Sequence, residues 1–150
     1  MLTRIESRQY VDREKVDINE LIAKLVSDFT DFAELNHLTV SVVKKHALEF
    51  SMNPDLAIIL FSNLIKNSLI HNKVGGEVRI EIADGSVRVS NTSEMGKMED
   101  NKIFARFEKG GAEKSGTGLG LAIAISIADL YGFQISYHYD GMQHFRIGEK

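Results

Sequence analysis

The glycine-rich segment from Gly116 to Leu121 constrains the fold of this chain more than any other feature. It reads Gly-Thr-Gly-Leu-Gly-Leu and leads into an apolar stretch that ends near Tyr131, before Gly132. The stretch predicts a buried helix from Gly118 to Tyr131, with Gly132 as its stop. Glycines let backbone N–H groups approach a ligand, and a helix start leaves such groups free. The segment therefore predicts a phosphate-binding helix start, and a flexible loop that ends at a helix is the alternative.

Two common phosphate-binding motifs do not match this segment. No Gly-Lys-Ser or Gly-Lys-Thr follows the first glycines, so it is not a Walker P-loop. The Gly-x-Gly-x-x-Gly spacing is absent, and the preceding residues predict a loop and not a strand, which argues against a dinucleotide fingerprint.

The composition predicts one soluble, cytoplasmic domain. The chain has 150 residues, of which 43% are hydrophobic and 26% charged, and no apolar run approaches the roughly 20 residues of a membrane helix. It carries 18 Lys and Arg against 21 Asp and Glu, a net charge of −3, which argues against nucleic acid as a partner. The absence of cysteine excludes disulfides and thiol catalysis.

Hydrophobic periodicity predicts an α+β fold with the helices on one face of a sheet. Asp17 caps an amphipathic helix over 18–35, and Asn53-Pro54 starts a second helix that runs to about His71. Alternation predicts two antiparallel hairpins, the first with Val78, Ile80 and Ile82 on its buried face and Arg79 and Glu81 on the other. The expected strands are 38–43, 47–52, 78–82, 87–91, 133–139 and 143–147, and residues 92–117 are expected to form a functional lid.

Asn63 and Asn67 are four residues apart on the second helix, and they share one face with apolar residues. An unpaired buried amide costs about 1–3 kcal/mol, so both side chains need partners. Two interpretations are open. The amides bond to the backbone or to each other, or they border a ligand cavity, where carboxamide oxygens suit Mg²⁺.

Two further segments contain candidate ligand contacts. Alternation places Asn91 on the buried side at the end of a strand, where it either starts a turn or reads an adenine edge with its amide. In the segment 103–109, the side chains of Phe104 and Phe107 are expected to anchor a loop on the core. Arg106 and Lys109 are either polyphosphate ligands or a solvated basic pair.

In this order, the four features resemble the ATP-binding catalytic domain of bacterial sensor histidine kinases. This family belongs to the superfamily of DNA gyrase, MutL and the ATP-driven heat-shock chaperones. Residues 63–67 resemble its N box, and residues 89–93 lie where its G1 box falls. Residues 104–107 resemble its F box, and residues 116–121 its G2 box. The resemblance implies a two-layer α/β sandwich of the Bergerat type, with a mixed, mostly antiparallel sheet, about three helices and a flexible ATP lid.

The resemblance implies ATP and Mg²⁺ as cofactors. Asn67 would hold the metal with Asn63 beside it, both as catalytic residues, and the backbone amides of Gly118, Leu119 and Gly120 would bind phosphate. The implied nucleotide contacts are Asn63, Asn67, His71, Asn91, Phe104, Arg106, Phe107, Lys109, Gly116, Thr117, Gly118, Leu119, Gly120 and Leu121.

The chain departs from the family pattern at three positions. Asn91 stands where the family has an acidic residue that contacts the adenine amino group, and Ser93 replaces the first glycine that follows. An Asn oxygen still accepts from an amino group, so the expected adenine contact is altered and not lost. Ile70 replaces a basic residue, and the adjacent His71 is the candidate substitute.

The chain has no motif that resembles a phosphoacceptor site. Pro54 is its only proline, and none of its five histidines precedes an acidic residue. The resemblance therefore implies an ATP-binding catalytic domain over 15–150, with residues 1–14 the remnant of an upstream dimerisation helix. The expected partners are the upstream phosphoacceptor domain and, indirectly, a response regulator. The full-length protein is expected to be a homodimer, with an inner-membrane anchor as one arrangement, and the isolated domain a monomer.

The expected activity is transfer of the ATP γ-phosphoryl group to a histidine on that upstream domain. Three alternatives stay open. A gyrase- or MutL-type ATPase is disfavoured, because those relatives carry a glutamate base where this chain has Asn63. A Ser/Thr protein kinase of the same superfamily is the second. A nucleotide-free interaction module is the third, suggested by the departures at Asn91 and Ile70.

Overall fold

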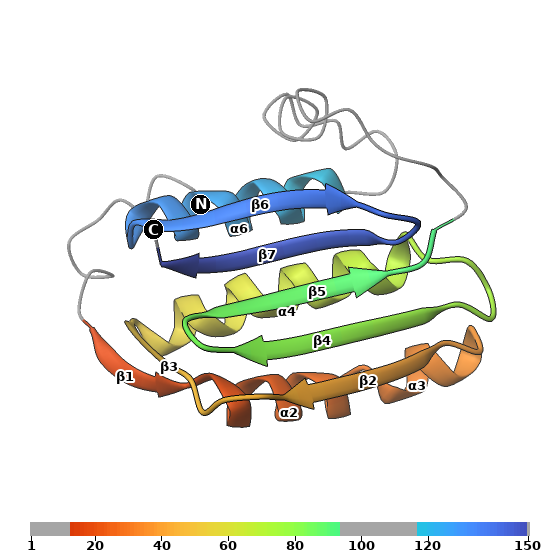
Figure 1. The fold of residues 1–150 in the computed structure, drawn as a ribbon, viewed down its shortest axis with the longest axis horizontal. Helices are drawn as coiled ribbons and strands as arrows, with labels where there is room; N and C mark the ends of the chain where they lie inside the picture. The colour runs from red at the N-terminus through yellow and green to blue at the C-terminus, as the bar shows by residue number, and fades with distance from the viewer. Residues whose placement is uncertain (1–12, 94–116, 150) are drawn as a thin grey trace.

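A five-stranded sheet faces a layer of helices in the computed structural model, which describes residues 13–93 and 117–149 (Figure 1). The strands, in spatial order, are β2 (Thr39–Lys44), β4 (Glu77–Ala83), β5 (Ser86–Asn91), β7 (Gln143–Glu149) and β6 (Phe133–Tyr139). The helices are α2 (Ile18–Asp28), α3 (Thr30–Leu35), α4 (Pro54–Ile70) and α6 (Thr117–Leu130).

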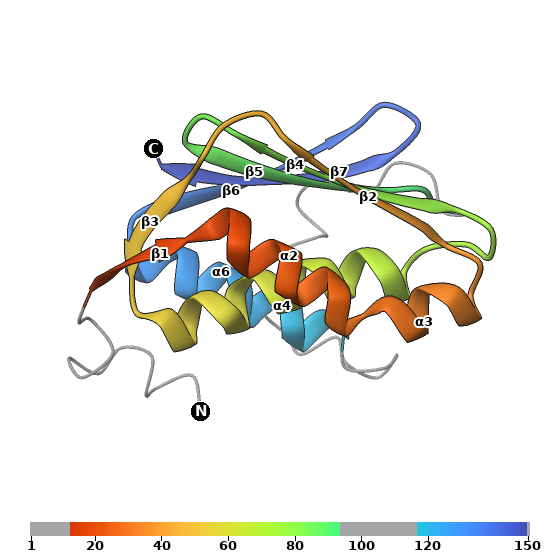
Figure 2. The same cartoon turned by 90° about the horizontal axis from the view of Figure 1, so that it is seen from below.

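All four of these helices cover the same face of the sheet, as Figure 2 shows. Strand β2 runs parallel to β4, and the other neighbouring pairs are antiparallel. These features confirm the predicted α+β class and the two-layer sandwich with a mixed, mostly antiparallel sheet. The three long helices match the expected number, and the short α3 adds a fourth.

A second, two-stranded sheet lies at one end of the molecule, where β1 (Glu14–Asp17) pairs antiparallel with β3 (Glu49–Met52). Strand β1 was not expected from the sequence. Arg13 precedes it, and its guanidinium donates to the Ser51 carbonyl at 3.1 Å and lies 4.9 Å from the centre of the Tyr131 ring. Residues 13 and 14 therefore already contact the domain.

The prediction of one helix over residues 18–35 is wrong in its continuity, because the structure divides it into α2 and α3 at Phe29. The Phe29 N–H is shared between the carbonyls of Leu25 and Val26, both at 3.2 Å. The Thr30 hydroxyl donates to the same Val26 carbonyl at 3.3 Å. A hydroxyl that bonds back by one turn in this way bends helices.

The predicted start of α4 is confirmed. The Asn53 side chain accepts the N–H groups of Asp55 at 2.8 Å and Leu56 at 3.2 Å, and Pro54 occupies the first helical position. Helix α6 ends before Gly132, whose φ of +73° is the left-handed conformation expected of a glycine stop.

Both predicted hairpins are present, and the alternation in their strands holds. Val78, Ile80 and Ile82 on β4 are completely buried against the helices. The core that they join also contains Phe50 from β3, whose ring centre lies 4.6 Å from that of Phe133. Such aromatic contacts add to the stability gained from burial alone. The core therefore links the small sheet to the edge of the large one.

Candidate functional site

Helices α4 and α6 lie side by side beneath the sheet, and Asn63 meets Gly120 where they touch (Figure 1). A Cβ atom built on Gly120 would lie 3.0 Å from the Asn63 Oδ1 atom, tighter than nine in ten real Cβ contacts. A side chain at position 120 would therefore displace the Asn63 carboxamide. This contact brings together the two elements that the sequence analysis assigned to metal and phosphate binding.

Asn67 lies one turn after Asn63 on α4, and both side chains are half-buried. Residues four apart share a helix face, so the two carboxamides follow the side of α4 that meets α6. The Asn67 carbonyl accepts the N–H of His71 at 3.1 Å. His71 is the exposed residue that ends the helix, at the same end of α4 as Asn67.

Helix α6 begins at Thr117, so Gly118 and Leu119 lie in its first turn. N–H groups in a first turn have no carbonyl partner within the helix, and they carry the positive end of the helix dipole. The side chain of Leu121 is 1% exposed and belongs to the core. At Leu121, only the backbone is suited to contact a ligand.

Asn91 is the last residue of β5 and is 2% exposed, on the buried side as predicted. Its Nδ2 atom donates to the Thr92 carbonyl at 2.8 Å. Within the described ranges, its Oδ1 atom has no hydrogen-bond partner. An amide fixed in this way presents an acceptor at the end of β5, beside α4.

A hydrogen-bond network that the sequence analysis missed ties the end of β5 to the end of α4. The Thr92 hydroxyl donates to Asn72 Oδ1 at 2.5 Å and accepts the Glu77 N–H at 2.9 Å. The Asn72 Nδ2 atom donates to the Glu77 carbonyl at 2.9 Å. A Cβ atom on Gly76 would overlap Thr92 Oγ1 and Asn72 Oδ1. The local sequence around Gly76 gave no sign of this packing.

The remaining predicted site residues lie outside the described residues. They are Phe104, Arg106, Phe107, Lys109 and Gly116. The predicted lid over 92–117 falls almost entirely in the same undescribed stretch. Their assigned contacts with phosphate and with the core stay predictions.

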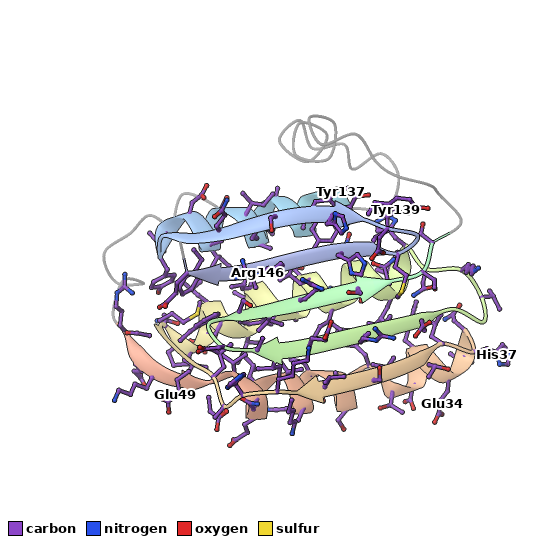
Figure 3. All side chains as sticks on the ribbon, viewed as in Figure 1. Glu34, His37, Glu49, Tyr137, Tyr139 and Arg146 are labelled. Carbon is purple, nitrogen blue, oxygen red and sulfur yellow. The ribbon has the colours of Figure 1, made fainter. Side chains whose placement is uncertain are left out.

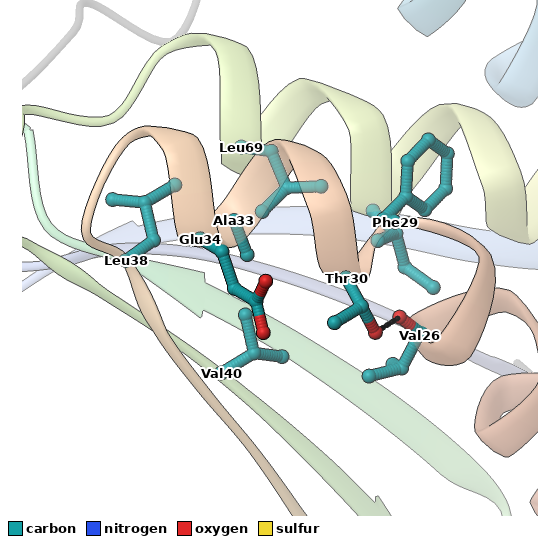
Figure 4. A pocket seen from close by; sticks show the side chains of 9 residues that line it. Val26, Phe29, Thr30, Ala33, Glu34, Leu38, Val40 and Leu69 are labelled. Carbon is teal, nitrogen blue, oxygen red and sulfur yellow. Dashed lines mark hydrogen bonds between the residues drawn. The ribbon is translucent and has the colours of Figure 1, made fainter.

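A hollow of about 210 Å³ lies elsewhere, between α3, β2 and α4 (Figure 4). Ile65 and Leu69 of α4 line it, and residues two apart on a helix point roughly 200° away from each other, so it lies on the far side of α4 from Asn67. Its lining is mostly aliphatic, with Thr30 and Glu34 as the polar residues. A carboxylate in an aliphatic hollow does not suit phosphate, so this hollow is not the predicted site.

The donor set of the predicted site fits magnesium better than a transition metal. In residues 13–93 and 117–149, no three His, Cys, Asp or Glu side chains gather in a geometry suited to a metal ion. Mg²⁺ needs few protein ligands, because it keeps several waters and binds substrate phosphates. The half-buried Asn67 carboxamide, one turn after Asn63 on α4, fits that requirement. Across the described part of the chain, no helix combines the length and apolar character of a membrane span.

Comparison with protein-family models places residues 52–148 in the family described as histidine kinase-, DNA gyrase B- and HSP90-like ATPases. Among curated proteins, the chain is 27% identical over 142 residues to the swarming motility regulation sensor protein RssA of Serratia marcescens. It is 24% identical over 143 residues to the heme sensor protein HssS of Staphylococcus aureus strain Newman. These matches cover 89% and 91% of this chain but only 30% and 31% of the relatives.

Solved structures share the fold. The catalytic domain of histidine kinase ThkA, in a nucleotide-free form, superposes with a TM-score of 0.76 at 23% identity and covers 91% of this chain and 94% of that one. The cytoplasmic segment of histidine kinase QseC superposes with a TM-score of 0.75 at 18% identity, over 99% of this chain and 85% of that one.

Proposed function

Because this chain belongs to the family of histidine kinase-, DNA gyrase B- and HSP90-like ATPases, we propose that it is the ATP-binding catalytic domain of a sensor histidine kinase. It transfers the γ-phosphoryl group of ATP to a histidine on a separate domain. The observation that carries the proposal is the packing of Asn63 against Gly120, which sets the Asn63 carboxamide beside the first turns of α6.

Phosphate binding is assigned to the start of α6. The first-turn N–H groups at Thr117, Gly118 and Leu119 donate to phosphate oxygens, and the helix dipole favours the negative charge. Asn67 holds Mg²⁺ through its carboxamide oxygen, and the metal, when bound, neutralises charge on the phosphates. Arg106 and Lys109 in the undescribed stretch are assigned to the same phosphates, and Phe104 and Phe107 to anchoring the lid.

Adenine recognition is assigned to Asn91. Because its Nδ2 atom is held by the Thr92 carbonyl, its Oδ1 atom is oriented to accept from the adenine amino group. A neutral amide replaces the family carboxylate here, and a neutral acceptor forms a weaker hydrogen bond than a charged one. We therefore expect modest ATP affinity. His71, at the end of α4, is assigned to phosphate in place of the missing basic residue at Ile70.

The chain needs no general base for this reaction. The acceptor imidazole nitrogen attacks the γ-phosphorus atom and forms the N–P bond, while the bond from phosphorus to the β,γ-bridging oxygen breaks and ADP leaves. Positioning and charge neutralisation supply most of the catalysis in phosphoryl transfer. Asn63 does not abstract a proton from water, which disfavours the hydrolase alternative.

The architecture of the whole protein is part of the proposal, because the chain spans about a third of the length of the curated relatives it matches. An upstream dimerisation and phosphoacceptor domain, preceding a catalytic domain over 15–150, supplies the acceptor histidine. A response regulator receives the phosphoryl group from it. The full-length protein is a homodimer, and this domain works in the cytoplasm and does not bind nucleic acid.

Calorimetric titration with a non-hydrolysable ATP analogue, with and without Mg²⁺, tests the site. The wild-type chain is expected to bind the analogue with Mg²⁺, and Asn67→Ala to lose at least about tenfold in Mg²⁺-dependent affinity. Ser62→Ala on the same helix is the matched control, because its hydroxyl bonds to the Ile59 carbonyl. Unchanged affinity in Asn67→Ala contradicts the metal assignment. Rapid ATP hydrolysis by the chain alone contradicts the kinase assignment.

A further inference from the structure

The face of the large sheet turned away from the helices has a cluster of positive charge. Figure 2 shows that no described helix covers this face, and Figure 3 looks onto it, with Arg146 labelled on β7. Alternation places Arg79 and Glu81 of β4, Arg88 of β5 and Arg146 of β7 on this face. All three arginines are exposed.

Arg88 and Arg146 lie directly opposite each other on neighbouring antiparallel strands. Like charges in this position repel each other across the strand pair. The open face therefore contains a repulsive pair of arginines. A bound negative charge between them would replace this repulsion with attraction.

A single carboxylate is shared among the cations of this cluster. Glu81 Oε2 lies 3.1 Å from Lys45 Nζ, and Glu81 Oε1 lies 3.9 Å from Arg88 Nη1. Arg146 has no ion-pair partner among residues 13–93 and 117–149. Lys45, Arg88 and Arg146 against Glu81 leave two positive charges around this carboxylate, in a chain whose net charge is −3. The cluster is therefore a local feature and does not reflect the overall charge.

These side chains also surround a depression of about 90 Å³. Ala83 and Ser86 line it with small side chains between the long cationic ones. Gly148 is the register partner of Ser86, and a Cβ atom there would lie 2.7 Å from the Gly85 carbonyl oxygen and 2.9 Å from Ser86 Cβ. Because Gly148 has no side chain, no atoms rise from β7 beside Ser86 at this part of the face.

We propose that the cluster of Lys45, Arg88 and Arg146 around this depression is a docking site for a short acidic segment of a partner protein. Guanidinium groups bind carboxylates through paired hydrogen bonds, and two of them here face one hollow. The site lies across the sheet from α4 and α6 (Figure 2), so it is separate from the proposed nucleotide site.

The length of the partner segment follows from the charge distribution. A long polyanion or an anionic membrane would extend beyond the cluster over a chain whose net charge is −3, and this charge would repel it. A segment with a few carboxylates contacts only the cluster. In addition, the outward positions of β4, β5 and β7 have no Phe, Tyr or Trp on which a nucleic acid base would stack.

Fluorescence anisotropy with a fluorescein-labelled oligoglutamate peptide at low salt tests the proposal on the 150-residue chain. The double variant R88Q/R146Q is expected to bind the peptide at least about tenfold more weakly than the wild type. The double variant K15Q/K24Q is the control, because it removes the same charge from exposed positions on β1 and α2. It is expected to stay within about twofold of the wild type. Glu81→Gln is expected to bind more tightly, since it frees Lys45 and Arg88.

Three results would overturn the proposal. They are an absence of peptide binding, an equal weakening in both double variants, and tighter binding of a DNA duplex or of anionic phosphatidylserine vesicles than of the peptide through the same arginines. Thermal unfolding tests whether a variant loses peptide binding only because it no longer folds. R88Q/R146Q is expected to melt close to the wild-type temperature, because the loss of the repulsive Arg88–Arg146 pair offsets the loss of the Arg88–Glu81 ion pair.

Discussion

Strand β5 displays the difference between the two faces of the sheet, because its residues alternate between them. Val87 and Val89 face the helices and are 0% and 1% exposed, whereas Arg88 between them is exposed on the open face. The helix-covered face carries mostly aliphatic side chains, and the open face carries arginines, carboxylates, hydroxyls and imidazoles. One face therefore supplies stability, and the other is left for contacts with other molecules.

The largest expected effect compares two adjacent residues of β4. Ile80 is fully buried on the helix side, and Ile80→Ala is expected to lower the free energy of unfolding by about 2–5 kcal/mol, because it leaves a cavity. Arg79→Ala, on the open side, is expected to change it by about 0.5 kcal/mol or less. Denaturation in urea measures both. Similar losses in the two variants would show that the open face is also part of the core.

The second prediction concerns the rim of the sheet, where the end of β5 meets the end of α4. Gly76→Ala is expected to lower the free energy of unfolding by about 3 kcal/mol, because its Cβ would separate the hydrogen-bonded Thr92 and Asn72. Gly75→Ala meets no atoms within 4 Å and suffers only from its φ of +83°, which costs about 1 kcal/mol. Equal losses in urea denaturation would contradict the packing explanation.

Gly148 is a position where the open face does not tolerate a side chain. Gly148→Ala would place a Cβ 2.7 Å from the Gly85 carbonyl oxygen, and a backbone atom does not move aside easily. We expect a loss of about 1–2 kcal/mol in the free energy of unfolding. Ser136→Ala, exposed on β6, is the control and should be neutral. A neutral Gly148→Ala would show that β5 and β7 adjust freely at this end.

Local patterns in the sequence were sufficient to predict most of the fold. The alternation in β4 predicted that Ile80 is buried and Arg79 exposed, because a strand has a period of two whatever it pairs with. The Asn53-Pro54 pair predicted the start of α4, because a capping side chain forms its hydrogen bonds within its own turn. The burial of Asn91 followed from its place in the same alternation.

Features that depend on distant partners were not predictable in this way. Strand β1 has four residues, and it exists because β3, much later in the chain, pairs with it. The bond between Thr92 and Asn72 joins residues 20 apart. The packing of Gly120 on Asn63 joins two helices, and only the resemblance to a family suggested that they meet.

The smallest expected effect concerns the hydrogen bond between His144 and Asp140, at the turn between β6 and β7. His144 Nε2 lies 2.7 Å from Asp140 Oδ1, and this hydrogen bond, with one from the Met142 N–H, holds the pKa of Asp140 below its ordinary value. A carboxylate whose pKa is lowered by folding adds stability above the pKa of the unfolded chain, and this stability is lost as the pH falls through the folded-state pKa. His144→Ala is therefore expected to raise the pKa of Asp140 and to reduce this acid-sensitive part of the stability.

The matched control is His138→Ala, on the opposite strand of the same hairpin, because His138 acts on Asp140 only through its charge. It is expected to raise the pKa of Asp140 by less than His144→Ala does. Carbon-13 NMR of the Asp140 carboxyl group, titrated with pH, measures both shifts. Equal shifts would show that the charge of the histidine pair, and not the hydrogen bond, controls Asp140.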